Sequence, residues 1–284
     1  MKKLLRILKW SGGVLLVLAI IGFILFKIYL DPFLTKMKQV SVVQYDKELT
    51  LLVGGGGNSG ILVSDSLVLV VDTKMGDAAE QLYKKVKELA GNKHILVVNT
   101  HIHPDHITGN KYYSGQQIIA GGNYTPEGWK KEAGAEGMPT QWLKDRMDIR
   151  MGSDTATLLN MGKNIHTASD VVVYLHRRKL LFAGDIILNK AAPILFGVAD
   201  PDAYLSALDD LTKQFDIKTI IPGHGPIGEI EILDAFRQYF LDMKTVAADN
   251  SKEDELETKY SDWDQIPFIM SPGTTVRAFR KKGK

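Results

Sequence analysis

Three histidines and one aspartate lie within six residues of this chain, in the segment HIHPDH at 101–106. Imidazole and carboxylate groups are the ligands that zinc-like divalent ions take in proteins, so the segment predicts a metal site. An apolar, β-branched run at 94–100 precedes it directly and predicts a buried strand. Sites in α/β sheets commonly lie where strands end. We therefore expect an α/β fold with a metal site at one edge of a sheet.

The spacing inside this segment divides it into two pairs. His101 and His103 are two residues apart, so in extended chain both side chains point the same way. Pro104 then turns the backbone, and Asp105 can cap a following helix, which aims Asp105 and His106 from a second direction. This geometry allows one metal ion to bind the first pair and a second ion to bind the second pair.

Composition limits the chemistry. The chain has 284 residues, enough for one large or two small domains, and it has no cysteine. Disulfides, thiolate metal sites and cysteine nucleophiles are therefore excluded. Residues 1–30 hold five of the 35 basic side chains and none of the 33 acidic ones, so the remainder has 30 basic against 33 acidic, or −3. This balance gives no support for a nucleic-acid partner.

The N-terminus has the pattern of a membrane anchor. Residues 1–9 form a basic flank, and residues 10–30 are apolar enough and about long enough to span a bilayer. Because positive flanks stay in the cytoplasm, we expect a single-pass signal anchor with the rest of the chain outside, in the periplasm or the extracellular space. A cleaved signal peptide is the alternative, although residues 28–32 lack the small residues that a cleavage site needs.

The remainder divides into three parts: a linker at 31–39, one domain at 40–248 and a charged, irregular tail at 249–284. Within the domain, segment 122–160 is polar and forms either a packed excursion or a lid. A glycine run at 54–60 predicts a tight loop between strands near the site. Strands are predicted at 40–45, 48–53, 61–63, 67–71, 94–99, 118–120, 171–175, 179–183 and 219–221, and helices at 77–90, 127–132, 140–149, 201–215 and 229–248.

Three further candidate ligands lie next to predicted strands. His166 comes shortly before the strand at 171–175, and Asp185 follows the strand at 179–183 after a glycine. His224 stands between two glycines at the end of the last strand, which lets the backbone come close to a neighbour. Each residue taken alone also fits a structural role, as a core histidine, a helix cap and a turn residue.

Together with Asp72, which follows the glycine run and a strand, these motifs occur in the order typical of one family. From about residue 40 to about residue 247 the chain resembles the metallo-β-lactamase fold hydrolases. The matching features are Asp72, the HIHPDH segment, His166 before threonine, Asp185 after glycine and His224 in PGHGP. The resemblance implies a four-layer αββα sandwich with the site at one edge, between the two sheets.

The resemblance also implies two divalent metal ions, zinc in the first place, with manganese or iron as alternatives. Asp185 would bridge the two ions, Asp72 would support a ligand histidine from behind, and Asp105 could also shuttle a proton to the leaving group. The first ion would be held by His101, His103 and His166, and the second by Asp105, His106 and His224.

The implied activity is hydrolysis of a small molecule by a metal-bound hydroxide. True β-lactamases of this family commonly carry Cys or Ser where this chain has Asp185, so the branch resembled is the one with thioesterases, lactonases and phosphodiesterases. We expect a membrane-anchored hydrolase for an ester, thioester, lactone or similar bond, with β-lactam hydrolysis at most secondary. The alternatives are a mononuclear iron oxygenase on the same fold and a non-catalytic metal-binding protein. Substrate and oligomeric state stay open.

Overall fold

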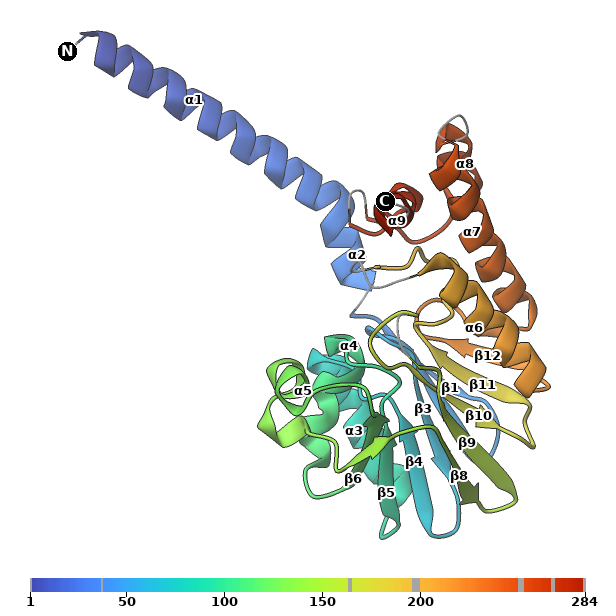
Figure 1. Ribbon diagram of the computed structural model, residues 1–284. Coiled ribbons are helices and arrows are strands. Elements are labelled where there is room, and N and C mark those ends of the chain that lie inside the picture. Colours follow the sequence, from blue (N-terminus) through green and yellow to red (C-terminus); the bar gives the residue numbers. More distant parts are fainter. Residues whose placement is uncertain are drawn as a thin grey trace.

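The computed structural model describes residues 2–36, 38–162, 165–195, 200–249, 253–266 and 269–282. Two β-sheets pack face to face, and helices cover their outer faces (Figure 1). Apolar side chains from both sheets, among them Leu69 and Val98 of one and Val173 and Phe182 of the other, fill the space between them. This arrangement is the predicted α/β sandwich, in which each sheet buries one face against the other and one against helices.

The first sheet has seven strands within the described residues, in the order in which they follow along the chain. They are β1 (Val40–Gln44), β2 (Leu49–Gly54), β3 (Ser59–Val63), β4 (Leu67–Val71), β5 (His94–Val98), β6 (Gln117–Gly121) and β7 (Gln141–Leu143). Neighbours from β1 to β4 are antiparallel, and those from β4 to β7 are parallel. The parallel strands therefore end at one common edge. Helix α3 (Gly76–Ala90) covers the outer face and buries Leu82 and Val86 there.

The second sheet has six strands in the described part of the chain, in the order β13-β12-β11-β10-β9-β8. They are β8 (Arg146–Met151), β9 (Asp154–Asn160), β10 (Val171–Leu175), β11 (Leu180–Gly184), β12 (Thr219–Pro222) and β13 (Gly228–Glu229). Because β11 and β12 are parallel, the loops that follow them begin side by side. Helices α6 (Pro201–Gln214) and α7 (Glu231–Ala248) cover its outer face (Figure 1).

The helix predicted at 140–149 is wrong, because this segment forms β7 and β8. The residues from Arg146 to Arg150 alternate between exposed and half-buried, which is the period of two expected of a strand with one face on the core. Strand β9, paired with β8, was not predicted either. The helix predicted at 127–132 is confirmed as α5 (Pro126–Ala133), which begins at a Thr125 side chain that accepts a hydrogen bond from the Gly128 N–H.

The irregular structure expected for 249–284 is also wrong in the described part of that segment. Helices α8 (Glu253–Lys259) and α9 (Pro272–Lys282) lie there, close to α7 (Figure 1). They bury Leu256, Val276 and Phe279 in the same apolar cluster as α6 and α7. Helices α8 and α9 are short and charged and contain few apolar residues. Their sequences therefore show too weak a helical periodicity of apolar residues to be predicted as helices.

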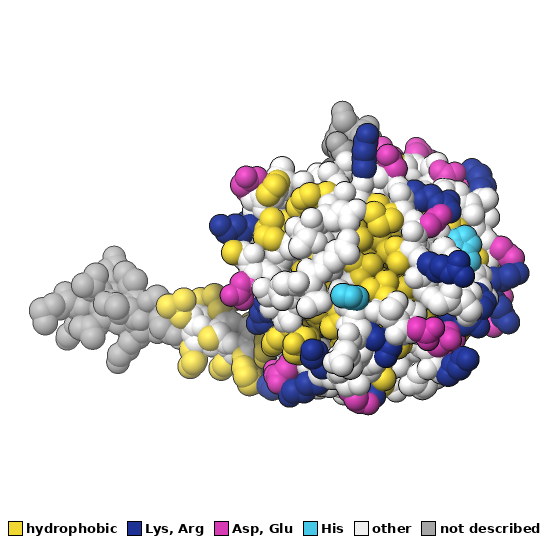
Figure 2. All heavy atoms as spheres, turned by 90° about the horizontal axis from the view of Figure 1, so that it is seen from below, with side chains coloured by type: hydrophobic (Ala, Val, Ile, Leu, Met, Phe, Trp, Pro, Cys, Tyr) yellow, Lys and Arg dark blue, Asp and Glu magenta, His cyan; other side chains and the backbone are white. Residues whose placement is uncertain are grey.

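The N-terminal segment is a long helix that projects away from the two sheets (Figure 1). It consists of α1 (Lys2–Leu25), one π-helical turn η1 (Phe26–Leu30) and α2 (Asp31–Lys36), so the first part of the expected linker is helical. Its stretch Gly13–Leu30 is long and apolar enough to cross a membrane, and none of that stretch is buried. Apolar side chains surround it in Figure 2, whereas basic and acidic side chains are interspersed over the body. A signal sequence would have the same length and composition.

One buried cation joins the two sheets at the edge opposite to the site. The Arg178 side chain lies in the β10–β11 turn and is only 4% exposed. It donates hydrogen bonds to Asp46 (Nε–Oδ2, 2.7 Å) and Glu48 (Nη2–Oε2, 2.6 Å) of the β1–β2 turn, and to Asp154 (Nη1–Oδ2, 2.6 Å) beside it. Removing one partner of such a buried group leaves the others uncompensated, which is costly.

We therefore expect Arg178→Leu to lower the free energy of unfolding by about 3 kcal/mol. Arg177→Leu is the matched control: this neighbouring side chain is 45% exposed and forms an ion pair with Glu48, so its loss should cost less than about 1 kcal/mol. Urea unfolding followed by tryptophan fluorescence measures both. Equal effects of the two substitutions would contradict the structural role given to Arg178.

Candidate metal centre

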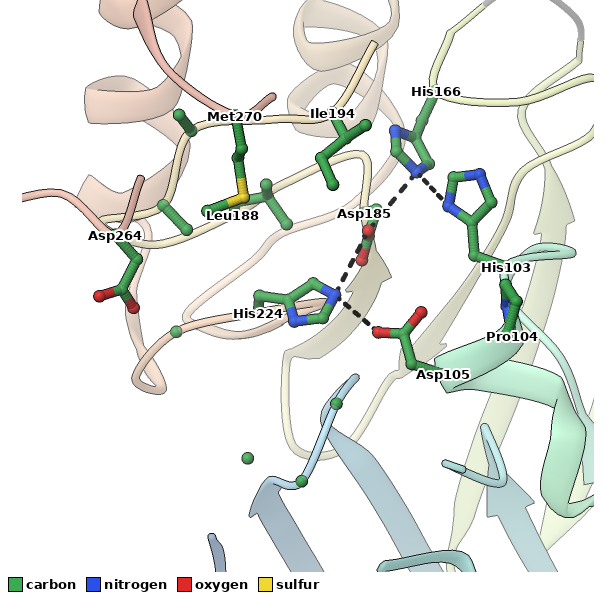
Figure 3. Close-up of a pocket in the computed structure, with 16 residues that line it drawn as sticks. His103, Pro104, Asp105, His166, Asp185, Leu188, Ile194, His224, Asp264 and Met270 are labelled. Carbon is green, nitrogen blue, oxygen red and sulfur yellow. Dashed lines mark hydrogen bonds and ion pairs between the residues drawn. The ribbon is translucent and has the colours of Figure 1, made fainter. Parts of the chain in front are cut away.

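Three of the predicted ligands meet at one point. His101 follows β5, His103 precedes α4 (Pro104–Ile107), and His166 lies in the loop between β9 and β10. His103 Nδ1 is 3.0 Å from His101 Nε2 and 3.0 Å from His166 Nε2. The prediction that the first two side chains point the same way is thus confirmed, and a segment more than sixty residues further along supplies the third (Figure 3).

The other three predicted ligands form a second cluster beside the first. The Oδ2 atom of Asp105 is 3.1 Å from His224 Nε2 and 3.6 Å from His106 Nε2. Asp105 and His106 both lie in the short helix α4, and His224 lies in the loop after β12. The predicted capping role of Asp105 is wrong: His103 is the N-cap residue, and the Asp105 carboxylate points at His224 (Figure 3).

Asp185, in the loop after β11, lies between the two clusters. Its Oδ2 is 3.4 Å from His166 Nε2 and 3.5 Å from His224 Nε2, and its Oδ1 is 3.2 Å from His106 Nε2. One carboxylate therefore faces histidines of both sets, which is the position that a bridging ligand needs. The two groups of residues that could hold a metal ion are His101, His103, His166 and Asp185, and Asp105, His106 and His224.

The donor atoms fit divalent ions better than they fit each other. His106 Nε2 and Asp185 Oδ1 are buried and lie 3.2 Å apart as an ion pair, but neither makes a hydrogen bond of good geometry among the described residues. Four ligands at 2.0–2.1 Å around a tetrahedral ion stand about 3.3 Å apart, close to the nitrogen separations of the first cluster. Buried polar atoms without a partner are costly. A cation is the simplest group that satisfies them together.

Asp72 fixes the orientation of one ligand. Its Oδ2 accepts a hydrogen bond from His106 Nδ1 at 2.7 Å, which leaves His106 Nε2 to face the cluster. The same carboxylate accepts hydrogen bonds from the Thr100 N–H and hydroxyl, both at 2.7 Å. Asp72 has a φ of +58°, an uncommon value for a residue with a side chain, so these three hydrogen bonds hold it in place.

The glycine run packs directly against the metal centre. A Cβ atom on Gly57 would lie 2.3 Å from the His106 ring, so only glycine fits there. The buried Lys74 ammonium donates to the carbonyl oxygens of Gly54 and Gly57, and the Asn58 amide donates to the carbonyl oxygen of Pro222. The loop predicted from the glycines is thereby fixed to both sheets, although neither Lys74 nor Asn58 was identified from the sequence.

Two other positioning residues were also missed. The Asp170 carboxylate accepts hydrogen bonds from the His166 and Thr167 N–H groups, and burial raises the pKa of Asp170 to about 6. The Tyr204 hydroxyl, on α6, donates to the Asp185 carbonyl oxygen at 2.9 Å. Asp170 stands directly before the strand predicted at 171–175, and this position at a strand end could have marked it as a candidate site residue. Tyr204 is an ordinary apolar-face residue of its helix, and nothing in the sequence distinguishes it.

The two clusters differ in their affinity for protons. Burial lowers the pKa of His166 to about 3 and that of His101 well below its ordinary value, so both are neutral at pH 7. Burial would also lower the pKa of His224, but the carboxylates of Asp185 and Asp105 raise it to about 10. For His106 the same carboxylates and Asp72 likewise outweigh burial, and its pKa is raised well above the ordinary value. Without a metal the second cluster thus holds protons that the first does not.

A pocket of about 320 Å³ opens over both clusters. The backbone of Gly54, Gly55 and Gly56 lines one part of it, and the metal-centre side chains line another. The remaining wall is apolar and comes from the segment after Asp185 and from the C-terminal segment (Figure 3). A concave site with a few convergent polar groups and an apolar surround is typical of small-molecule binding.

Comparison with known proteins identifies the family. The chain matches the metallo-beta-lactamase superfamily over residues 52–224, more than half of its length. It is 24% identical over 185 residues to a type 2 metallo-beta-lactamase of Bacteroides fragilis, covering 64% of this chain and 74% of that one. A beta-lactamase-like protein 2 homolog of Caenorhabditis elegans is 28% identical over 175 residues, which cover 61% of this chain and 57% of that one. The chain belongs to the metallo-beta-lactamase superfamily.

Solved structures agree in fold. A metallo-beta-lactamase from Pontibacter korlensis superposes with a TM-score of 0.62 at 22% identity, covering 72% of this chain and 100% of that one. The DIM-1 metallo-beta-lactamase superposes with a TM-score of 0.60 at 22% identity, covering 72% and 98%. At this identity the likeness shows the fold alone. The curated relatives named metallo-beta-lactamases place the chain with metal-dependent hydrolases at the level of the superfamily.

The proton affinities predict that acid removes metal from the second cluster first. A metal ion there must displace both the proton that His224 holds below pH about 10 and the one that His106 holds, and each displaced proton lowers the metal affinity about tenfold for each unit of falling pH. The first cluster has no such proton to displace in this range. Metal content after dialysis against fixed free Zn²⁺ at several pH values measures this. Loss of metal from both clusters over the same pH range would contradict this prediction.

Proposed function

We propose that the protein is a membrane-anchored, dinuclear metal-dependent hydrolase that acts outside the cytoplasm on an ester, thioester, lactone or similar bond of a small molecule. The observation that supports this best is the position of Asp185, whose two oxygens face histidines of both clusters. A single-metal site, as in an iron oxygenase, would need only the first cluster. The second cluster, whose three side chains could hold an ion of their own, favours two ions.

The ligand chemistry supports zinc, with manganese or iron as alternatives. The first cluster offers three imidazoles and one carboxylate, and zinc binds such nitrogen and oxygen ligands readily. Divalent ions bound at the two clusters supply a Lewis acid and an activated water near neutral pH. The chain contributes the ligand positions, held by Asp72, Asp170 and the glycine run, and the pocket that limits access of bulk water.

Asp105 is better suited to hold a metal than to act as a base. Burial would raise its pKa, but His106 and His224 lower it below the ordinary carboxyl value. A carboxylate with a lowered pKa holds a proton weakly, and efficient general bases have pKa values near the working pH. We therefore assign Asp105 first to the second cluster and only secondarily to proton transfer.

Hydrolysis of β-lactams is proposed as secondary at most. Curated relatives such as the protein of Bacteroides fragilis are named metallo-beta-lactamases, but the identity of these relatives to this chain is only 24–25%. This chain has Asp185, not Cys or Ser, between the clusters, and this is the feature that separates it from the β-lactamase branch in the resemblance described above. The substrate is therefore sought among other carbonyl and phosphoryl compounds.

The site predicts a sharp difference between two histidine substitutions. His101→Ala removes a buried ligand and should reduce hydrolysis at least a hundredfold. His94→Ala, at the exposed start of β5, is the matched control and should leave activity unchanged. The metal-loaded proteins are assayed on phosphodiester, carboxyl ester, thioester, lactone and β-lactam panels, with bound metals measured on the same samples. Equal activity of the two variants, or one bound iron with oxygen consumption, would overturn the proposal.

Anchoring is tested separately. The wild-type chain should stay in the membrane fraction after alkaline carbonate extraction, with residues 1–30 intact by mass spectrometry. Leu18→Arg with Ile21→Arg should release it, because a charge at the centre of a membrane helix costs about 3 kcal/mol. Val42→Arg, on an exposed apolar residue outside the helix, is the control and should change nothing. A mature chain that starts after residue 30 would show a cleaved signal peptide instead.

A further inference from the structure

The pocket over the metal centre has one wall made of apolar side chains. Figure 3 shows Leu188, Ile194 and Met270 together on one side of Asp185 and His224. Leu188 and Met270 are almost fully buried, at 4% and 6% exposed, and Ile194 is half-buried. The complete apolar wall consists of Leu188, Ala191, Ala192, Ile194 and Met270.

Two chain segments build this wall, one that runs from Leu188 to Ile194 and one that contains Asp264 and Met270, and backbone hydrogen bonds join them. The Asp264 N–H donates to the Lys190 carbonyl oxygen at 2.7 Å, and the Ala192 N–H donates to the Asp264 carbonyl oxygen at 3.0 Å. Met270 is held by a backbone pair with Ile266, with N–O distances of 2.8 and 2.6 Å. Met270 lies beyond residue 224, where the match to the superfamily ends. The wall thus combines four residues inside the matched region with one, Met270, that the family match does not cover.

An apolar wall beside a polar centre selects a ligand with two kinds of surface. Each methylene that leaves water for such a wall favours binding, whereas a polar group placed against it loses its hydrogen bonds to water. The wall is finite: the metal-centre residues His166 and Asp185 bound it on one side, and the Asp264 carboxylate stands at the other (Figure 3). With a cavity of about 320 Å³, the pocket suits a compact ligand.

The same apolar cluster reaches the N-terminal helix. Leu188, Ala191, Ala192 and Met270 belong to the core cluster of the second sheet, and Ile194 packs against it. Leu30, the last residue of the stretch long enough to cross a membrane, packs against this cluster too. The wall and the end of the membrane-type helix therefore contact one and the same apolar cluster.

We infer that the substrate is an amphiphile: a hydrolysable ester-type group joined to an apolar chain of several carbons, with the chain against the wall formed by Leu188, Ala191, Ala192, Ile194 and Met270. This inference rests on the proposed hydrolase function and narrows its substrate class. Molecules of this kind partition into bilayers, so anchoring the enzyme at the membrane places the pocket where they concentrate.

The test uses the full chain in phosphatidylcholine vesicles, loaded with Zn²⁺. Two ester panels are compared, one that lengthens the acyl part from acetyl to hexanoyl and one that lengthens the alcohol part by the same four methylenes. A methylene that is completely buried against the wall raises kcat/KM about fourfold. Over four methylenes we therefore expect kcat/KM to rise roughly 20- to 250-fold along at least one panel. A flat profile in both panels would overturn the inference.

Variants of the wall separate binding in the pocket from partition into the vesicle. Met270→Glu and, independently, Ile194→Glu should flatten the profile to within about threefold, because a carboxylate beside the chain must be desolvated. Ile269→Glu is the matched control, since this neighbouring side chain is 57% exposed and does not line the pocket. It should keep both the profile and the acetyl ester activity of the wild type. A profile that persists in both wall variants would contradict the assignment.

A binding measurement distinguishes failure of the inference from failure of the hydrolase proposal. Octanoate should bind the wild type and Ile269→Glu at least tenfold more tightly than acetate by calorimetry, and Met270→Glu should lose this preference while retaining its thermal unfolding transition. If no ester is hydrolysed but the preference is found, the ester chemistry fails and the apolar subsite stands. If esters are hydrolysed with no dependence on chain length and no preference is found, the subsite is wrong and the hydrolase proposal stands.

Discussion

The structure depends on one constraint: seven imidazole and carboxylate side chains converge at one edge of the two sheets. Three imidazole nitrogens lie within 3.0 Å of their neighbours, and the buried His106 Nε2 and Asp185 Oδ1 atoms lie 3.2 Å apart without a hydrogen bond of good geometry. Such a set is stable only if the surrounding chain holds each group and a cation balances them.

The surrounding chain is organised to hold these groups. Parallel pairing of β4 with β5 and of β11 with β12 brings the ends of four strands to one edge. Other side chains then fix the ligands or their loops from behind: Asp72 for His106, Asp170 for His166 and Tyr204 for the loop of Asp185. The glycine run closes the centre, because a side chain at Gly57 would occupy the space of the His106 ring.

Much of this could be predicted from the sequence, for physical reasons. Buried strands such as β4 and β5 are continuous apolar runs, and helix α3 has a clear amphipathic period. The ligands were recognisable because histidines and carboxylates were spaced around strand ends. The strands β7 and β8 were mistaken for a helix because their polar residues also fit a helical pattern over a few residues.

What the sequence could not provide are relationships between distant segments. The hydrogen bond of Tyr204 to the Asp185 loop and the amide of Asn58 on Pro222 depend on the packing of whole elements. The apolar wall is of the same kind. Backbone hydrogen bonds join Asp264 to Lys190 and Ala192, and others join Met270 to Ile266. Met270 thereby lines the same pocket as Leu188. These tertiary contacts determine which substrate fits, so substrate preference is less predictable than the chemistry.

In the proposed metal centre, Asp185 joins two metal sites into one. Elemental analysis of the full chain, purified without chelators, tests this when wild type and Asp185→Asn are compared. We expect two divalent ions per chain in the wild type and a loss of bound metal in the variant. One ion per wild-type chain, or an unchanged pair of ions in Asp185→Asn, would contradict it.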